Sequence, residues 1–229
     1  MTKLAERLQR VEERIAAACR RAGRERADVK LVAVTKSVDV ETARQLVELG
    51  VRDLGENRPQ ELWRKASALP GDVCWHLIGH LQRNKVEKTL PLATMIHSVD
   101  SWRLLESLEQ EAARQSRTID VLLECNASGE ASKQGFALKE VPALALRIAT
   151  LQCLRVLGLM TMAAYNAEPE NCRATFAALR SLRDELRTKL APPHTMVQLS
   201  MGMSNDFEVA IEEGATIIRL GTVLFAPGS

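Results

Sequence analysis

The sequence predicts a (β/α)8 barrel with one extra helix at its N-terminus. Three observations support this fold class: short β-rich runs alternate with amphipathic stretches, there are eight such units, and no Pro-, Gly- or Ser-rich linker separates them. Strict alternation implies parallel strands joined by right-handed crossovers. Eight units close most naturally into a barrel, with an open doubly wound sheet as the alternative. Because these units leave no residues for a second domain, we expect a single domain over residues 1–229.

The extra helix is predicted ahead of the first strand. Apolar residues recur there at helical spacing, and the pattern stops near Gly23. The residues that carry the pattern are Leu4, Leu8, Val11, Ile15 and Ala18.

Short apolar runs predict the strands, and amphipathic stretches predict the helices between them. The strands are expected over residues 31–35, 51–55, 73–79, 94–99, 119–126, 154–160, 195–200 and 216–221. The helices are expected over residues 40–50, 59–69, 82–90, 101–115, 139–151, 170–190 and 205–214, with a short tail after the last strand.

The composition argues against several classes of function. A net charge of +2 and an aromatic content of 3% give no basic, base-stacking surface, so we expect no nucleic-acid partner. No apolar stretch approaches the roughly 18 residues of a membrane span, and the N-terminus lacks the apolar stretch of a signal peptide. The five cysteines are scattered without a C-x-x-C pair, which is typical of reduced thiols. We therefore expect a cytoplasmic protein with no membrane partner.

In a barrel, the functional residues lie at the carboxyl ends of the strands. Lys36 comes directly after the first predicted strand, so it is expected at this end. By the two-residue period, Lys36 shares a strand face with Val32 and Val34. A lysine shielded from water has a lowered pKa and can form a Schiff base with a carbonyl group. The alternative is a lysine whose amine simply reaches solvent where the strand ends.

The loops after the seventh and eighth strands are where barrels often hold phosphate. The first of these loops, residues 200–204, offers the hydroxyls of Ser200 and Ser204 and a glycine that lets backbone approach a ligand. Ser204 is also a plausible N-cap for the next helix, whose N–H groups can bind an anion. Gly221 and Thr222 repeat this arrangement one strand later. Ordinary capping and turn chemistry is the alternative explanation for such residues.

Arg219 lies one residue before the end of the last apolar strand. A cation in the barrel mouth should have a partner. It either forms a core ion pair, with Glu124 or Glu56, or contacts a ligand, and the spacing leaves both open. His76 and His80 are four residues apart but lack the glutamate of H-E-x-x-H, so we expect no metal site.

The segment WHLIGHLQRNK at residues 75–85 resembles the W-H-x-I-G-x-L-Q-x-N-K signature of the pyridoxal 5′-phosphate (PLP) homeostasis proteins. These proteins are single-domain relatives of the alanine racemase barrel, which is PLP fold type III. The other matching segments are LVAVTK ending at Lys36, LGEN at 54–57, HSVDS at 97–101, SGEASKQGF at 128–136, GLMTM at 158–162, SMGMSNDFEVAI at 200–211 and RLGTVLF at 219–225. The resemblance covers nearly the whole chain in the family's order.

The resemblance implies PLP as the cofactor, held as a Schiff base on Lys36. It implies that Arg219 faces the pyridine nitrogen and that Asn57 lies near the ring. The phosphate contacts that it implies are Ser200, Ser204, Gly221 and Thr222. Met160, Met203 and His80 are expected to pack beside the cofactor. Three residues depart from the family's usual Pro, Tyr and Gly, namely Asp39, Arg58 and Ala226.

The function that the resemblance implies is a non-enzymatic PLP carrier or buffer, monomeric, that supplies apo-PLP enzymes. One alternative is a PLP-dependent amino-acid racemase, which would need an acid–base group on each face of the cofactor. The chain's one tyrosine, Tyr165, is expected in the loop after the sixth strand. A further alternative is a Schiff-base aldolase or a phosphosugar isomerase that binds phosphate in the same loops.

Overall fold

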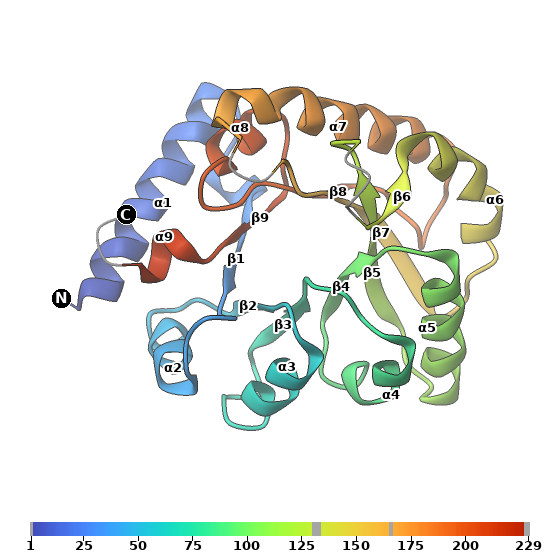
Figure 1. Ribbon diagram of the computed structural model, residues 1–229, viewed down its shortest axis with the longest axis horizontal. Helices are drawn as coiled ribbons and strands as arrows, with labels where there is room; N and C mark the ends of the chain where they lie inside the picture. The colour runs from blue at the N-terminus through green and yellow to red at the C-terminus, as the bar shows by residue number, and fades with distance from the viewer. Residues whose placement is uncertain (1, 130–133, 165–166, 227–229) are drawn as a thin grey trace.

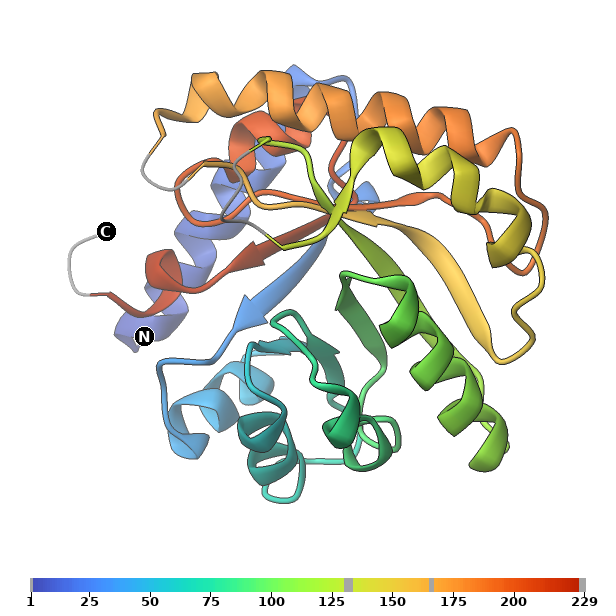
Figure 2. The same ribbon diagram turned by 45° about the vertical axis from the view of Figure 1, so that its right-hand side comes forward.

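The computed structural model describes residues 2–129, 134–164 and 167–226, and within them eight parallel strands form a closed ring (Figure 1, Figure 2). The strands of the ring are β1 (Lys30–Val34), β2 (Asp53–Glu56), β3 (Cys74–Leu77), β4 (Met95–Val99), β5 (Ile119–Asn126), β7 (Leu154–Met160), β8 (Gln198–Ser200) and β9 (Ile217–Leu220). The ring closes because β1 pairs with β9 and β4 pairs with β5, all in parallel. The predicted (β/α)8 barrel is confirmed, and the open sheet is excluded.

The helices lie outside the ring and cover it (Figure 2). They are α1 (Lys3–Arg21), α2 (Val40–Glu48), α3 (Pro59–Ala66), α4 (Val86–Thr89), α5 (Trp102–Arg114), α6 (Ala145–Ile148), α7 (Arg173–Arg187), α8 (Phe207–Glu212) and α9 (Thr222–Phe225). Short 3-10 turns are η1 (Arg26–Asp28), η2 (Arg83–Lys85), η3 (Leu138–Leu144) and η4 (Pro169–Cys172), and a two-residue strand, β6 (Phe136–Ala137), adds to the edge of β5. η1 and β6 were not predicted, whereas η2, η3 and η4 overlap segments that were predicted as helices. In η3 the proline Pro142 lacks the N–H that a regular α-helix would use, so the expected helix over 139–151 begins only at Ala145.

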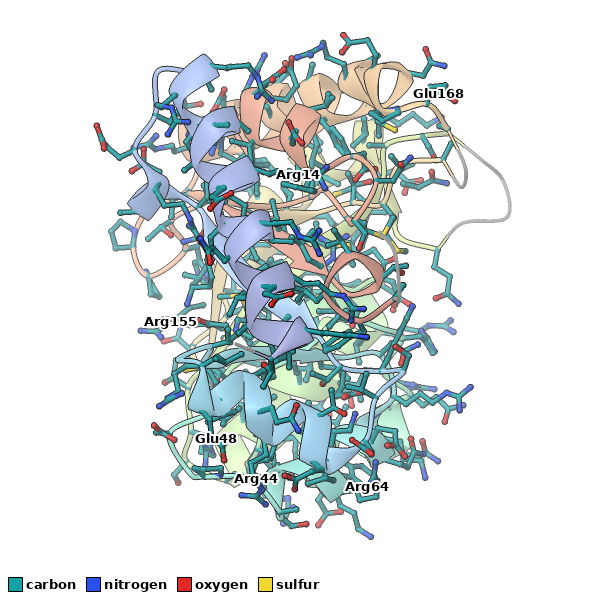
Figure 3. All side chains as sticks on the ribbon, turned by 90° about the vertical axis from the view of Figure 1, so that its left-hand side faces the viewer. Arg14, Arg44, Glu48, Arg64, Arg155 and Glu168 are labelled. Carbon is teal, nitrogen blue, oxygen red and sulfur yellow. The ribbon has the colours of Figure 1, made fainter. Side chains whose placement is uncertain are left out.

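The extra N-terminal helix is confirmed as α1, which buries Leu4, Val11 and Ile15. Figure 3 faces this helix and shows Arg14 where α1 lies beside α8. Arg14 pairs with Glu208 of α8 at 2.9 Å. Such half-exposed pairs each stabilise a protein by only about 1 kcal/mol or less, so they align the two helices while the apolar face supplies the attraction.

The apolar core has two parts. The larger part lies between the ring and the surrounding helices. The smaller part fills the inside of the barrel with five buried side chains, which are Val32, Met95, Leu122, Met160 and Ile217. Because side chains alternate along each strand, the next inward positions after Met95, Leu122 and Ile217 are His97, Glu124 and Arg219. Apolar side chains therefore pack beneath part of the candidate site, and charged groups lie above them.

The three departures from the family pattern all lie at helix ends. Asp39 is the N-cap of α2, and its Oδ1 accepts a hydrogen bond from the backbone N–H of Thr42 at 2.8 Å. Arg58 precedes Pro59 at the start of α3 and is exposed, and Ala226 ends α9. An aspartate is a favourable N-cap, so the first departure has a structural reason. Among the described residues, no helix is long and apolar enough to cross a membrane.

Candidate functional site at the strand ends

Lys36 lies two residues past the end of β1, in a turn, and it is exposed. Its amine is therefore not shielded from water in the way that the apolar strand suggested. On the neighbouring strand, β9 leads directly into Gly221 and Thr222. A Cβ atom at Gly221 would lie 3.3 Å from the carbonyl oxygen of Val34, so these two strand ends are close together. The lysine and the last loop thus share one edge of the barrel.

The backbone just before Lys36 is held by a buried ion pair that the sequence analysis missed. Lys65 of α3 and Glu56 of β2 are both fully buried, and Lys65 Nζ lies 2.7 Å from Glu56 Oε1. Lys65 Nζ also donates to the carbonyl oxygen of Thr35 at 2.6 Å, and the Thr35 hydroxyl donates to Glu56 Oε1 at 2.6 Å. This cluster fixes the peptide that carries Lys36. The sequence feature that could have revealed this ion pair is the position of Lys65 on the apolar face of its helix, beside Leu62.

The loops after β8 and β9 are joined through Ser204. Its Oγ accepts hydrogen bonds from the backbone N–H groups of Gly221 and Val223, both at 3.3 Å. An oxygen atom is thus bound at the start of α9, where the exposed Thr222 hydroxyl also lies. The prediction that Ser204 caps α8 was wrong, because Asp206 is the N-cap and its Oδ1 accepts from the N–H of Met203 at 2.5 Å.

In the structure, Gly202 lets its loop pack against α8, which is a different role from letting a ligand approach the backbone. It is buried, its φ is +92°, and a Cβ atom there would lie 2.6 Å from the Cβ of Ala210 in α8. A side chain is disfavoured by both the backbone conformation and the packing. The glycine therefore lets this loop turn tightly over α8.

Arg219 and Ser200 are both buried inside the barrel. Arg219 Nη1 donates to Ser200 Oγ at 2.6 Å, and its Nη2 donates to the carbonyl oxygen of Thr161 at 3.0 Å. Burial lowers the pKa of Arg219 to about 10, although nearby carboxylates act in the other direction, so the side chain is a cation at neutral pH. Ser200 ends β8 inside the barrel, and its contact with a phosphate stays a prediction.

Neither core ion pair considered for Arg219 is present among the described residues. Glu56 is engaged by Lys65 outside the ring. Glu124 lies at the end of β5 and makes no ion pair with Arg219 within 4 Å in the part of the chain that is described. Burial, with a smaller contribution from Asp100, raises the pKa of Glu124 to about 7.

The remaining predicted residues surround this edge. Met160 is buried in the barrel interior, and Met203 is half-buried in the loop after β8. Asn57 is half-buried after β2, where a Cβ atom on Gly79 would lie 2.8 Å from the Asn57 Cβ. His80 is exposed and its Nδ1 lies 2.9 Å from Asp100 Oδ2, so it belongs to the next strand ends along the ring.

Most of the predicted residues therefore lie on one arc of neighbouring strands. In ring order the arc runs β2, β1, β9, β8 and β7. It carries Asn57, Lys36, Arg219 with Gly221 and Thr222, Ser200 with Met203 and Ser204, and Met160. Tyr165 lies outside the described residues. Across the described ranges, no group of three or more His, Cys, Asp or Glu side chains could hold a metal ion.

An exposed lysine, an interior arginine and two loops rich in donors, all at adjacent strand ends, define a barrel suited to an anionic carbonyl ligand. Comparison with known proteins gives the family. Residues 7–227 match the model of the alanine racemase N-terminal domain family. The chain belongs to this family, and within it to the pyridoxal phosphate homeostasis proteins.

Several relatives support this assignment. The pyridoxal phosphate homeostasis protein of Aquifex aeolicus is 45% identical over 96% of both chains. The human protein of the same name is 36% identical over 95% of this chain and 84% of its own. PipY of Synechococcus elongatus, solved with PLP bound, is 34% identical with a TM-score of 0.84, covering 98% of this chain and all of PipY. Alanine racemase of Clostridium difficile shares only the fold, at 16% identity and a TM-score of 0.68 over 95% of this chain and 56% of its own.

Proposed function

We propose that this protein binds PLP reversibly through Lys36 and serves as a carrier or buffer that supplies apo-PLP enzymes. The observation that carries the proposal is the single arc of strand ends that holds Lys36, Arg219 and the loop of Gly221 and Thr222. Its relatives are named for PLP homeostasis, and PipY was solved with PLP bound. We also infer one domain over residues 1–229, a cytoplasmic location and a monomeric state.

The residues present fit the chemistry of PLP. Lys36 offers an amine for the aldehyde, and Arg219 offers a cation whose N–H groups can only donate. The hydroxyls of Ser204 and Thr222 and the Gly221 N–H offer donors for a phosphate, at a position where the Ser204 Oγ already accepts hydrogen bonds from two backbone N–H groups. When bound, PLP supplies a reactive aldehyde and an electron-withdrawing ring. The neighbouring strands β1 and β9 set the lysine and the phosphate donors side by side.

A carrier role is favoured by Arg219. A donor opposite the ring nitrogen favours the neutral form of that nitrogen, which weakens the ring as an electron sink. Arg219 is held by Ser200 and Thr161 and remains a cation, so it cannot act as an acceptor there. The site is thus suited to hold the ligand and poorly suited to turn substrates over.

The attachment of PLP can be tested by borohydride reduction of the PLP-loaded protein, followed by peptide mass analysis. We expect the phosphopyridoxyl group on the peptide that contains Lys36. Lys36→Ala should abolish the visible absorbance while the circular dichroism spectrum stays unchanged, because the exposed side chain contributes nothing to the core. The matched control is Lys85→Ala, an exchange at a lysine of η2 away from the arc.

Two outcomes would contradict the proposal. Labelling mainly at Lys85 or Lys133 would remove Lys36 from the site. Racemisation of alanine by the purified protein at ordinary enzyme rates, lost in Lys36→Ala, would favour the racemase over the carrier. The carrier also requires that the loaded protein restore an apo-PLP enzyme to activity.

A further inference from the structure

A continuous line of hydrogen bonds crosses the inside of the barrel and ends on Arg219. Asp53 Oδ1 lies 2.8 Å from His76 Nε2, and His76 Nδ1 lies 2.9 Å from His97 Nε2. His97 Nδ1 lies 2.9 Å from Ser200 Oγ, which accepts from Arg219 Nη1 at 2.6 Å. The described structure therefore links a carboxylate to the guanidinium through two imidazoles and one hydroxyl.

The line runs from the amino end of the strands to the carboxyl end. Asp53 begins β2 and is partly exposed, whereas the two histidines are at most 1% exposed. His97 of β4 reaches Ser200 of β8, on the far side of the ring, so the line passes through the barrel interior. None of these side chains except Ser200 and Arg219 belongs to the arc at the strand ends.

The Asp53 end fixes the direction of the hydrogen bonds along this line, and the Arg219 end is compatible with that direction. At one end Arg219 can only donate, so Ser200 Oγ accepts from it. At the other end burial would raise the pKa of Asp53, but hydrogen bonds from His76 and Lys30 hold it below its ordinary value. Asp53 is therefore a carboxylate at neutral pH and can only accept.

The histidines between the ends are neutral. Burial lowers the pKa of His76, and burial, with the Arg219 cation acting in the same direction, lowers the pKa of His97 well below its ordinary value. A neutral imidazole has one donor nitrogen and one acceptor nitrogen. The Ser200 hydroxyl thus donates to His97 Nδ1, His97 Nε2–H donates to His76 Nδ1, and His76 Nε2–H donates to Asp53. The opposite direction would need a proton on Asp53.

We propose that Asp53, His76 and His97 are positioning residues that act on Arg219 through Ser200 as a one-directional hydrogen-bond relay. The negative charge of Asp53 polarises the line and makes Ser200 Oγ a stronger acceptor for Arg219. The relay holds the guanidinium in one orientation, with N–H groups left for a ligand beyond the two that Ser200 and Thr161 use. A group at the opposite end of the barrel therefore influences the binding of PLP. This last step rests on the proposed function.

The direction of the relay is tested on the ligand-free wild-type protein by nitrogen-15 NMR of labelled histidine side chains. We expect both His76 and His97 as the neutral form with the proton on Nε2. A proton on Nδ1 of either ring would overturn the relay. This measurement needs neither a variant nor PLP.

The coupling to the ligand is tested with Asp53→Asn, which keeps the shape and an acceptor but removes the charge. We expect weaker PLP binding, on the order of tenfold, and a shifted absorbance maximum for bound PLP. The matched control is Asp120→Asn at the start of β5. Asp120 also pairs with a basic residue, Arg155, and the two carboxylates are similarly exposed, at 17% and 21%.

Equal effects of Asp53→Asn and Asp120→Asn on PLP binding would overturn the coupling while leaving the carrier function intact. A wild-type protein that takes up no PLP would overturn the carrier function, and the histidine protonation would still decide the relay. The two proposals can therefore fail separately.

Discussion

Glu124 carries a carboxyl group whose pKa the barrel raises to about 7 from 4.5. The folded protein thus holds this proton up to a higher pH than the unfolded chain does. Relative to Glu124→Gln, the wild-type protein should gain stability as pH falls from above 7 to 4.5. The gain should reach about 3 kcal/mol when it is complete.

This prediction is measured by urea unfolding of both proteins between about pH 5 and pH 8. The titration of the buried histidines is common to both proteins and cancels in the difference. Glu48→Gln, at an exposed carboxylate of α2, is the control. A difference between wild type and Glu124→Gln that stays constant with pH would contradict the assignment.

Among single residues, the sequence predicted those that lie at strand ends and missed those whose role depends on a partner in a distant element. Lys36, Gly221 and Thr222 could be found because strand ends are where barrels place their sites. His97 could not, because its partner Ser200 lies across the ring and no spacing along the chain reveals that contact. The role of Lys65 could not be predicted for a related reason, because Lys65 lies in α3 and its ion-pair partner Glu56 lies in β2.

Among the elements, the loops after β8 and β9 act together, because Ser204 accepts from both Gly221 and Val223. Replacing Ser204 and Thr222 with alanine should weaken PLP far more than pyridoxal, which lacks the phosphate. Each lost hydrogen bond to a charged group is worth roughly 1.5–3 kcal/mol. Titration of both ligands against wild type and the double variant measures the effect.

The control for this prediction is Asn205→Ala, an exposed residue of the same loop whose side chain donates to the carbonyl oxygen of Ala167. It should leave both affinities unchanged. Equal weakening of PLP and pyridoxal in the double variant would show that these loops are not the phosphate site.

Element boundaries were the least predictable part of the fold. The helix expected over 205–214 begins only at Phe207, because Asp206, Met203 and Ser204 form a hydrogen-bonded turn first. The helix expected over 82–90 is reduced to η2 and α4. The periodic pattern of apolar residues indicates which face is buried, but local side-chain hydrogen bonds decide where a helix starts.

For the whole molecule, we expect a monomer in solution. Within the described ranges the large apolar side chains that remain exposed come from five different segments, namely Leu49, Leu92, Leu146, Met162 and Val197. Scattered single residues of this kind are ordinary on a monomer, whereas a stable homodimer buries a continuous apolar patch. Light scattering after gel filtration should give the mass of one chain at micromolar concentration, and a mass of two chains would contradict this.

Closure of the ring also has a consequence for biosynthesis. Lys30 in the first strand pairs in register with Ile217 in the last, and Arg7 near the start of the chain donates to the carbonyl oxygen of Phe225. While the chain is being synthesised, β1 can therefore pair with β2 early, but it gains its second neighbour, β9, only after the other strands of the ring have been made. The lysine that we assign to PLP follows the first strand of the ring, whereas Arg219 and the loop beside it belong to the last strand of the ring. We therefore expect PLP to bind only once β9 has closed the ring.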